Sequence, residues 1–274
     1  MDDEIVVGVK KNTKKATPNK KKKTSKKAKK GKVRKQAKIL FGVLIFVILV
    51  FLLLCSPLFD IKNIQIEGNQ KLSNEKITSI STLQLHTNIF KFNKGLVKEK
   101  IKANAYVESV EITRFLPSTV EMKIKERTPK YMLQFADSYV YINNQGYMLE
   151  ISNEKLDVPV LIGFTTDLSN IKAGNRINVA DLKKMDMVIK IYEAANSNEL
   201  GKLVTKIDIS NDKNYAIILE TDGNKKVYLG DCTDLNTRIL YLKTMLKTLS
   251  GKSGEVFLNV DLNVQDAYFR PSSN

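Results

Sequence analysis

The feature that most constrains this chain is an apolar run from Ile39 to Cys55, in which every residue is apolar or glycine. At about 1.5 Å of rise per residue, the run reaches roughly 25 Å as a helix, and residues 56–59 can carry it through the membrane interface. It therefore predicts one transmembrane helix, residues 39–58. A cleaved signal peptide is the alternative, but the basic region before the run is long and no small-x-small cleavage pattern follows it.

The segment before the apolar run is dense in lysine. Residues 1–38 carry 16 Lys and Arg against three acids, which accounts for +13 of the formal charge of +16 of this 274-residue chain. The segment has too few large apolar side chains to offset the entropy cost of ordering, so we predict a disordered tail. Because lysine collects on the cytoplasmic side of spanning helices, we expect a single-pass type II protein of the cell membrane, with C-terminal domains outside the cell.

Two classes of ligand fit such a tail. Anionic lipid of the inner leaflet attracts clustered lysines, and the phosphates of DNA or RNA are neutralised by lysine without sequence specificity. No aromatic residue is interleaved with the lysine clusters to stack on bases. Inner-leaflet anionic lipid is therefore the expected partner of the tail, and a specific nucleic acid is not expected.

Residues 59–128 show the pattern of a small α+β domain. The periodicity of apolar residues predicts five elements: a strand around 64–66, a helix capped by Ser73, a helix over 93–105, and two strands over 107–115 and 119–126. The last strand has the clearest alternation, because Val120, Met122 and Ile124 are separated by polar residues. The predicted order is β-α-α-β-β.

One stretch of this domain, YVESVEITRFLPSTVEMKIKERTPKY at residues 106–131, carries a resemblance to a known family. Its signature comprises Tyr106-Val107, Arg114, Pro117, Glu126-Arg127 and Pro129. In this order, beyond a basic-flanked membrane helix, these residues resemble the polypeptide-transport-associated (POTRA) domain of the bacterial cell-division family FtsQ/DivIB. Ala105 departs from the family pattern, in which many members have proline.

The resemblance continues through residues 129–271, in the stretches YVYINNQGYMLE, VPVLIG and DLNVQDAYFRP, and it implies a second, β-rich domain of the FtsQ/DivIB type. Two helices are also predicted by periodicity alone, with apolar faces formed by Leu182, Met185, Ile189 and Tyr192 and by Leu235, Ile239, Leu242, Leu246 and Leu249. The expected fold class is α+β: a basic tail, one transmembrane helix, a POTRA domain and a mixed strand-rich domain, with residues 272–274 as a short C-terminal tail.

The sequence shows no pattern typical of a catalytic, metal or cofactor site. His86 is the single histidine, which excludes sites that need two imidazoles, and the GKS triplet at 251–253 follows a predicted helix instead of opening one. Cys232 is far along the chain from Cys55, so we expect it to be buried or unpaired. We predict no enzyme, no cofactor, no metal and no small-molecule substrate.

The resemblance implies a membrane-anchored scaffold of the division septum, which binds FtsB/DivIC-like and FtsL-like membrane proteins and helps organise septal peptidoglycan synthesis. A POTRA-type receptor for polypeptide transport or assembly at the cell surface is the alternative. Such receptors usually carry tandem POTRA repeats before a β-barrel, and only one unit is predicted here. An enzyme of cell-wall hydrolysis is a third hypothesis, which no motif favours.

The expected partner site is the last strand, Ala267, Tyr268, Phe269 and Arg270. As the final strand of the chain it has no following strand to cover it, so one edge should offer unpaired N–H and C=O groups to a partner strand. Tyr268 and Arg270 should project from one face and Phe269 from the other. Alternatively, the two aromatic residues only close the domain core. The helix over Asp234–Leu249 is the next candidate interface.

Overall fold

The structure, a computed structural model, describes residues 26–220, 222–262 and 266–272, with the side chains of residues 26–33 left out. The chain divides into two compact units, Met1–Cys55 and Ser56–Asn274, and each is described by itself. The described elements are helices and strands in an α+β arrangement, which confirms the predicted fold class.

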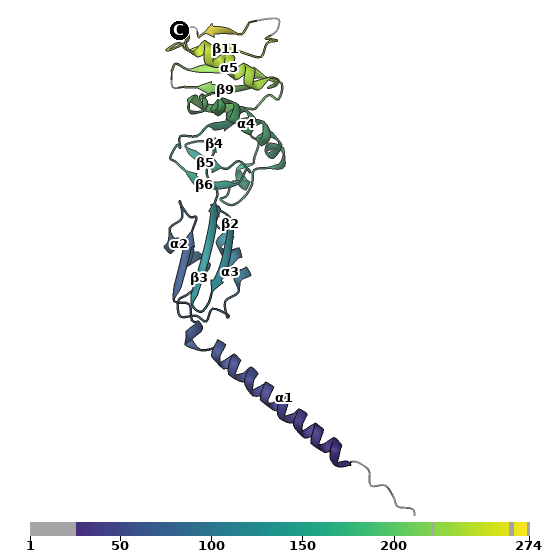
Figure 1. Ribbon diagram of the computed structural model, residues 1–274. Coiled ribbons are helices and arrows are strands. Elements are labelled where there is room, and N and C mark those ends of the chain that lie inside the picture. Colours follow the sequence, from purple (N-terminus) through teal and green to yellow (C-terminus); the bar gives the residue numbers. More distant parts are fainter. Residues whose placement is uncertain (1–25, 221, 263–265, 273–274) are drawn as a thin grey trace, which may run out of the picture. The chain divides into compact units, whose positions relative to one another are not determined.

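The first unit contains the helix α1 (Lys26–Leu54), shown in purple and blue in Figure 1. Its part from Arg34 to Leu54 is long and apolar enough to cross a membrane. The helix begins inside the segment expected to be disordered. Lysine, arginine, glutamine and alanine are good helix formers, so the helix extends from the apolar run toward the N-terminus. It ends before Pro57, whose ring disfavours a helix interior, so residues 56–58 do not extend it as predicted. The predicted disorder of residues 1–25 lies outside the described residues.

The second unit opens with a three-stranded sheet flanked by two helices (Figure 1). Its elements are β1 (Asn63–Glu67), α2 (Asn74–Ser81), α3 (Lys94–Lys102), β2 (Val107–Phe115) and β3 (Thr119–Glu126). The central strand β3 pairs parallel to β1 and antiparallel to β2. The predicted β-α-α-β-β order is therefore present, and Ser73 caps α2 by accepting from the Lys76 N–H. The second helix ends at Lys102, three residues short of its predicted end.

The core of this first sheet follows the predicted alternation. Val120, Met122 and Ile124 of β3 are buried, and they pack with Ile77 of α2 and Val97 of α3. The intervening residues of β3 are exposed or half-buried. One face of the strand therefore packs against the two helices.

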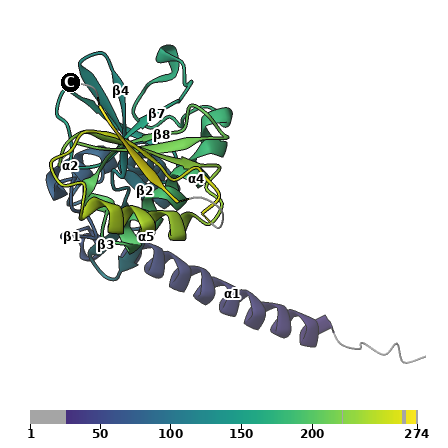
Figure 2. The ribbon, with the colours of Figure 1, turned by 90° about the horizontal axis from the view of Figure 1, so that it is seen from above.

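A nine-stranded sheet follows, in the order β12-β11-β10-β9-β8-β7-β4-β5-β6. Its strands are β4 (Tyr131–Phe135), β5 (Ser138–Ile142), β6 (Met148–Ser152), β7 (Val160–Ile162), β8 (Val204–Asp208), β9 (Tyr215–Leu219), β10 (Lys225–Gly230), β11 (Gly254–Phe257) and β12 (Tyr268–Pro271). The pairs β4–β7, β7–β8 and β10–β11 are parallel, and the others are antiparallel. Figure 2 shows the strands β4, β7 and β8 turning relative to one another, as expected for a twisted sheet.

Two of the three connections between paired parallel strands contain an α-helix, and the third, from β4 to β7, runs through β5 and β6. Helix α4 (Val179–Ser197) lies between β7 and β8 in the chain, and α5 (Leu235–Leu246) lies between β10 and β11. Both contribute to one apolar core with the strands. Three short 3-10 turns complete the described elements: Pro57–Phe59, Leu168–Asn170 and Gly201–Leu203.

The buried face of α4 differs from the predicted one. Met185 is buried as expected, but Val188, Ile191 and Ala195 complete the buried stripe. The predicted residues Leu182, Ile189 and Tyr192 are half-buried at its flank, where the Tyr192 ring lies 5.7 Å from that of Tyr131. The half-buried residues pack against the same core, so the helix contacts it with more than one row of side chains. On α5 the predicted stripe is present, with Ile239 and Leu242 fully buried.

Candidate partner interface

The predicted site strand lies at an edge of the nine-stranded sheet. β12 pairs with β11 on one side only, and no strand of the described residues lies on its other side. The strand begins at Tyr268, so Ala267 comes just before it, half-buried against the core. Figure 1 shows β11 with α5 beside it.

The register determines which backbone groups of β12 point outward. Glu255 lies opposite Arg270, and Val256 opposite Phe269. The Ser272 N–H donates to the Ser253 carbonyl at 3.0 Å, so that pair is hydrogen-bonded. Because bonded and non-bonded pairs alternate in an antiparallel ladder, the amides of Tyr268 and Arg270 face β11. The N–H and C=O of Phe269 therefore face away from the sheet, toward the open edge.

Two residues shape this edge. Pro271 also occupies an outward-facing position and has no N–H to donate, which is typical of edge strands. Gly254 allows β12 to approach β11, because a Cβ at this glycine would lie 2.2 Å from the carbonyl oxygen of Arg270. The groups available for a further strand are therefore concentrated at Ala267 and Phe269, with the Pro271 carbonyl after them.

Aromatic side chains form a ladder across one face of the last three strands. The rings of Tyr228 and Phe257 lie 5.0 Å apart, and those of Phe257 and Tyr268 lie 4.7 Å apart with 13° between their planes. The Arg270 guanidinium lies 4.6 Å from the centre of the Phe257 ring. Tyr268 remains 41 % exposed at the end of the ladder. Stacked rings of this kind supply apolar contact area at a low cost in side-chain entropy.

One carboxylate connects the three strands on the same face. The Tyr228 hydroxyl donates to Glu255 Oε1 at 2.8 Å, and this bond, together with burial, raises the pKa of Tyr228. Arg270 Nη1 lies 3.3 Å from Glu255 Oε2. The Arg270 side chain is thus held in a defined position while most of it stays open to solvent.

The opposite face of these strands belongs to the core. Val227 and Val256 are fully buried, and Phe269 packs against the same cluster as Ile239 and Leu242 of α5. The structure therefore places Tyr268 and Arg270 on the solvent face and Phe269 toward the helix. Of the two aromatic residues that the alternative hypothesis places in the core, Phe269 packs there and Tyr268 is exposed. Ala267 also packs against the core.

Sequence reasoning missed Tyr228, Phe257 and Glu255, which share this face with Tyr268. Their alternation places them on one side of β10 and β11, but only the cross-strand register brings them together. Strand pairing across the sequence separation between β10 and β12 cannot be derived from local periodicity.

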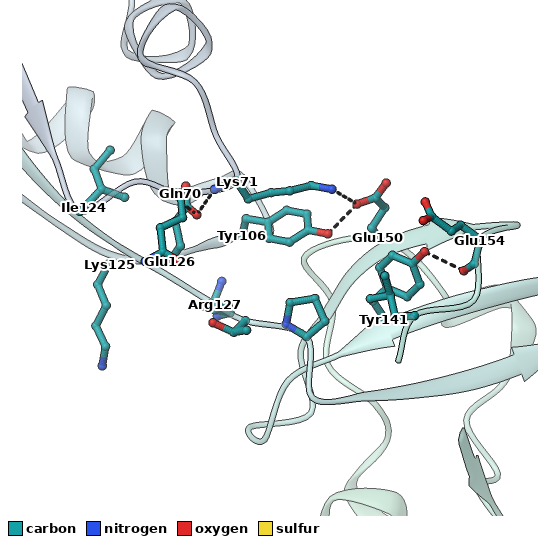
Figure 3. Close-up of a pocket in the computed structure, with 14 residues that line it drawn as sticks. Gln70, Lys71, Tyr106, Ile124, Lys125, Glu126, Arg127, Tyr141, Glu150 and Glu154 are labelled. Atoms are coloured by element: carbon teal, nitrogen blue, oxygen red, sulfur yellow. Dashed lines mark hydrogen bonds and ion pairs between the residues drawn. The ribbon is translucent and has the colours of Figure 1, made fainter. Parts of the chain in front are cut away.

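A second candidate site is a cavity of about 480 Å³ beside the junction of the two sheets (Figure 3). The Tyr106 hydroxyl donates to Glu150 Oε2 at 2.5 Å, and Lys71 Nζ lies 3.3 Å from the same oxygen. The bond from Tyr106 lowers the pKa of Glu150, while burial and Glu150 raise that of Tyr106. The Tyr141 hydroxyl donates to the Glu154 carbonyl. The polar groups of the cavity thus bond mainly to one another.

Four residues of the family signature, Tyr106, Glu126, Arg127 and Pro129, line the same cavity, and the contacts of Glu126 and Arg127 are structural. The Glu126 carboxylate accepts from the N–H groups of Gln70, Lys71 and Leu72 at 2.7 to 3.1 Å. Arg127 Nη1 donates to the carbonyls of Ala105 and Val107, and its guanidinium lies 4.0 Å from the centre of the Tyr147 ring. These contacts hold the loops next to the junction and present no free nucleophile or acid.

The part of the chain that the structure describes shows neither a cluster of metal-binding side chains nor a reactive cysteine. It contains no group of three His, Cys, Asp or Glu residues placed to hold a metal ion. Cys232 is a free thiol, and burial raises its pKa to about 12, so the unreactive thiol form prevails at neutral pH.

Comparison with known proteins agrees with this picture. The family model of the FtsQ-type POTRA domain matches residues 59–127. The cell division protein DivIB of Clostridium tetani is 30% identical over 213 residues, which cover 73% of this chain and 74% of the relative. DivIB of Clostridium botulinum is 27% identical over 182 residues, covering 66% and 71% of the two chains. FtsQ of Syntrophotalea carbinolica is 25% identical over 212 residues, covering 76% and 72%.

These relatives are named as cell division proteins, and the aligned parts cover 73% and 76% of this chain, more than the POTRA domain alone. The described residues also contain one helix able to span a membrane, close to the N-terminus. The chain therefore belongs to the FtsQ/DivIB family of cell division proteins.

Proposed function

We propose that this chain is a scaffold of the division septum, anchored by α1, that binds FtsB/DivIC-like and FtsL-like membrane proteins through the second unit. In this role it helps to organise septal peptidoglycan synthesis and carries out no chemistry itself. The observation that carries the proposal is the open edge of β12, where backbone groups at Ala267 and Phe269 have no strand partner among the described residues.

An incoming strand would extend the nine-stranded sheet by one. Its backbone would bond to the N–H and C=O of Phe269, and such main-chain bonds provide affinity with little dependence on sequence. Specificity would come from side chains, because Tyr268 and Arg270 stand beside the new strand on the solvent face. An aromatic or aliphatic residue of the partner would pack on Tyr268, and a carboxylate would pair with Arg270.

The membrane arrangement belongs to the same proposal. The N-terminal tail would lie in the cytoplasm, where its lysines contact anionic lipid of the inner leaflet, and the second unit would lie outside the cell at the septum. The charge of residues 1–38 supports this orientation. Within the second unit, residues 59–128 would form the POTRA domain and residues 129–271 the partner-binding domain.

Affinity measurements on two variants test the partner site. Tyr268→Ala and Arg270→Glu should each weaken capture of the FtsB/DivIC-like partner tenfold or more, which corresponds to about 1.4 kcal/mol. Both side chains are exposed, so thermal unfolding of the second unit should change little. Binding is measured with the purified second unit and the extracellular region of the partner.

Tyr241→Ala is the matched control. Tyr241 on α5 is 42 % exposed, nearly the same as Tyr268, but it belongs to the other candidate interface. The proposal expects this variant to bind like the parent. If Tyr241→Ala weakens binding while Tyr268→Ala and Arg270→Glu do not, the partner docks on α5 and not on β12.

A further inference from the structure

The large apolar side chains exposed in the first sheet and its helices gather at one end. Within residues 59–126 they are Leu85, Phe90, Leu96, Phe115 and Leu116. Leu85, Phe90 and Leu116 lie in loops, Phe115 is the last residue of β2, and Leu96 lies in the first turn of α3. Leu58, which directly precedes this region, is exposed as well. Scattered apolar residues are normal on a protein surface, but exposed apolar residues that gather at one end are typical of an interaction site.

Backbone contacts show that three loops form this end, namely residues 56–62, 84–93 and 115–118, here called the basal loops. The Ile89 N–H donates to the Phe59 carbonyl at 2.8 Å, and the Lys62 N–H donates to the Ser118 carbonyl at 2.8 Å. The rings of Phe59 and Phe90 lie 5.3 Å apart. The exposed apolar side chains therefore share one surface, although they come from distant parts of the sequence.

The basal loops and the residues that flank them are also basic. Lys62, Lys91, Lys94 and Arg114 lie in or next to these loops, against the single acid Asp60. The Arg114 guanidinium lies 4.4 Å from the centre of the Phe92 ring and donates to the Phe92 carbonyl. Phenylalanine and leucine together with lysine form the composition that settles at a membrane interface, where apolar groups enter the acyl boundary and cations meet lipid phosphates.

The covalent chain limits how far this surface can be from a bilayer. Leu58 follows the end of α1 at Leu54 by four residues, and four extended residues span at most about 14 Å. This limit holds for any orientation of the second unit relative to α1. With α1 across a membrane, the basal loops cannot leave the neighbourhood of its headgroup layer.

We propose that the basal loops bind the lipid surface of the membrane that α1 crosses, with Leu58, Phe90, Phe115 and Leu116 in the interface and the lysines against phosphates. The unit would then be attached at two places, the spanning helix and its own apolar end. This second contact restricts the rotation of the unit about its short tether. The inference is independent of the partner site at β12.

The chain contains no tryptophan, so one introduced tryptophan reports on its own environment. The full chain carrying Leu116→Trp is reconstituted into vesicles of phosphatidylglycerol and phosphatidylcholine, with part of the phosphatidylcholine brominated on its acyl chains. Bromine quenches only a nearby indole. We expect brominated lipid to reduce the emission of this tryptophan about twofold or more, as for interfacial aromatic residues.

Leu240→Trp on α5 is the matched control, since Leu240 is 55 % exposed and Leu116 is 59 % exposed. Its emission should not change with brominated lipid. Phe90→Trp, in a different basal loop, provides a second reporter should Leu116→Trp unfold at a lower temperature than the parent. If the basal tryptophans are unquenched in vesicles that contain this chain alone, or if the control is quenched equally, lipid does not cover this surface and the proposal is wrong.

Discussion

At the scale of single residues, the three charged residues of the family signature, Arg114, Glu126 and Arg127, all form hydrogen bonds with backbone groups. The Glu126 carboxylate accepts three N–H groups from residues 70–72, which form the loop that leads from β1 to α2. Hydrogen bonds to a charged carboxylate are stronger than those between neutral groups, and here three of them converge on one side chain. Glu126 therefore connects the end of β3 to a loop 54 to 56 residues earlier in the chain.

Replacing this carboxylate should be costly. Glu126→Ala leaves three N–H groups without their acceptor, so we expect the free energy of unfolding of the second unit to fall by about 2 to 3 kcal/mol. Glu108→Ala is the control, because Glu108 makes an exposed ion pair with Lys125 and its loss should cost less than about 1 kcal/mol. Urea unfolding followed by circular dichroism measures both. Equal losses for the two variants would show that the three N–H bonds contribute little.

Other residue-scale features could not be predicted from the sequence. Asp181 is fully buried, where it accepts from the N–H and hydroxyl of Thr165 and from the hydroxyl of Thr166. Lys225 is also buried, with its amine against the Asp222 carbonyl. From the sequence alone, Asp181 and Lys225 would be expected on the solvent-exposed surface. A local sequence pattern does not show which distant loop supplies their hydrogen-bond partners. Burial of a charge becomes favourable only once those partners are in place.

At the scale of elements, alternation in β3 was the strongest local signal, and the structure has the predicted face buried. Ile124→Asp should therefore place an unpaired carboxylate in the core, at a cost of several kcal/mol. Lys123→Thr, on the exposed face of the same strand, should cost less than about 1 kcal/mol. Thermal unfolding of the second unit compares the two. A normal melting temperature for Ile124→Asp would mean that this side of β3 is not packed as described.

Elements that depend on distant packing were predicted less well. Apolar residues recur at every second position from Val256 through Leu262, but β11 ends at Phe257, and residues 263–265 lie outside the described residues. On α4 the buried stripe includes Val188 and Ile191, because contacts with distant strands of the core decide which side of the helix is covered. The position of β12 at the sheet edge was predicted from its place in the chain. The aromatic ladder beside it required the register of three strands.

At the scale of the whole molecule, the proposed function depends on orientation in the membrane. In a chain without Cys55 and Cys232, a single cysteine at Ser25 should be shielded from an impermeant thiol reagent in intact cells, and one at Ser253 should be labelled. The reason is that the lysine-rich segment remains on the cytoplasmic side. Ser253 is exposed, so its labelling reports access to the reagent and not burial. The reverse pattern would place the β12 edge in the cytoplasm and contradict the proposed function.

The central claim, that a partner adds a strand to β12, is tested most directly by amide hydrogen exchange at Phe269. The Phe269 N–H points to the open edge, whereas that of Arg270 faces β11. In the free second unit Phe269 should exchange quickly and Arg270 slowly. Saturation with the FtsB/DivIC-like partner should slow exchange at Phe269 by about tenfold or more, with little change at Arg270. If the partner binds and Phe269 exchanges as fast as before, no strand is added at this edge and the claim is wrong.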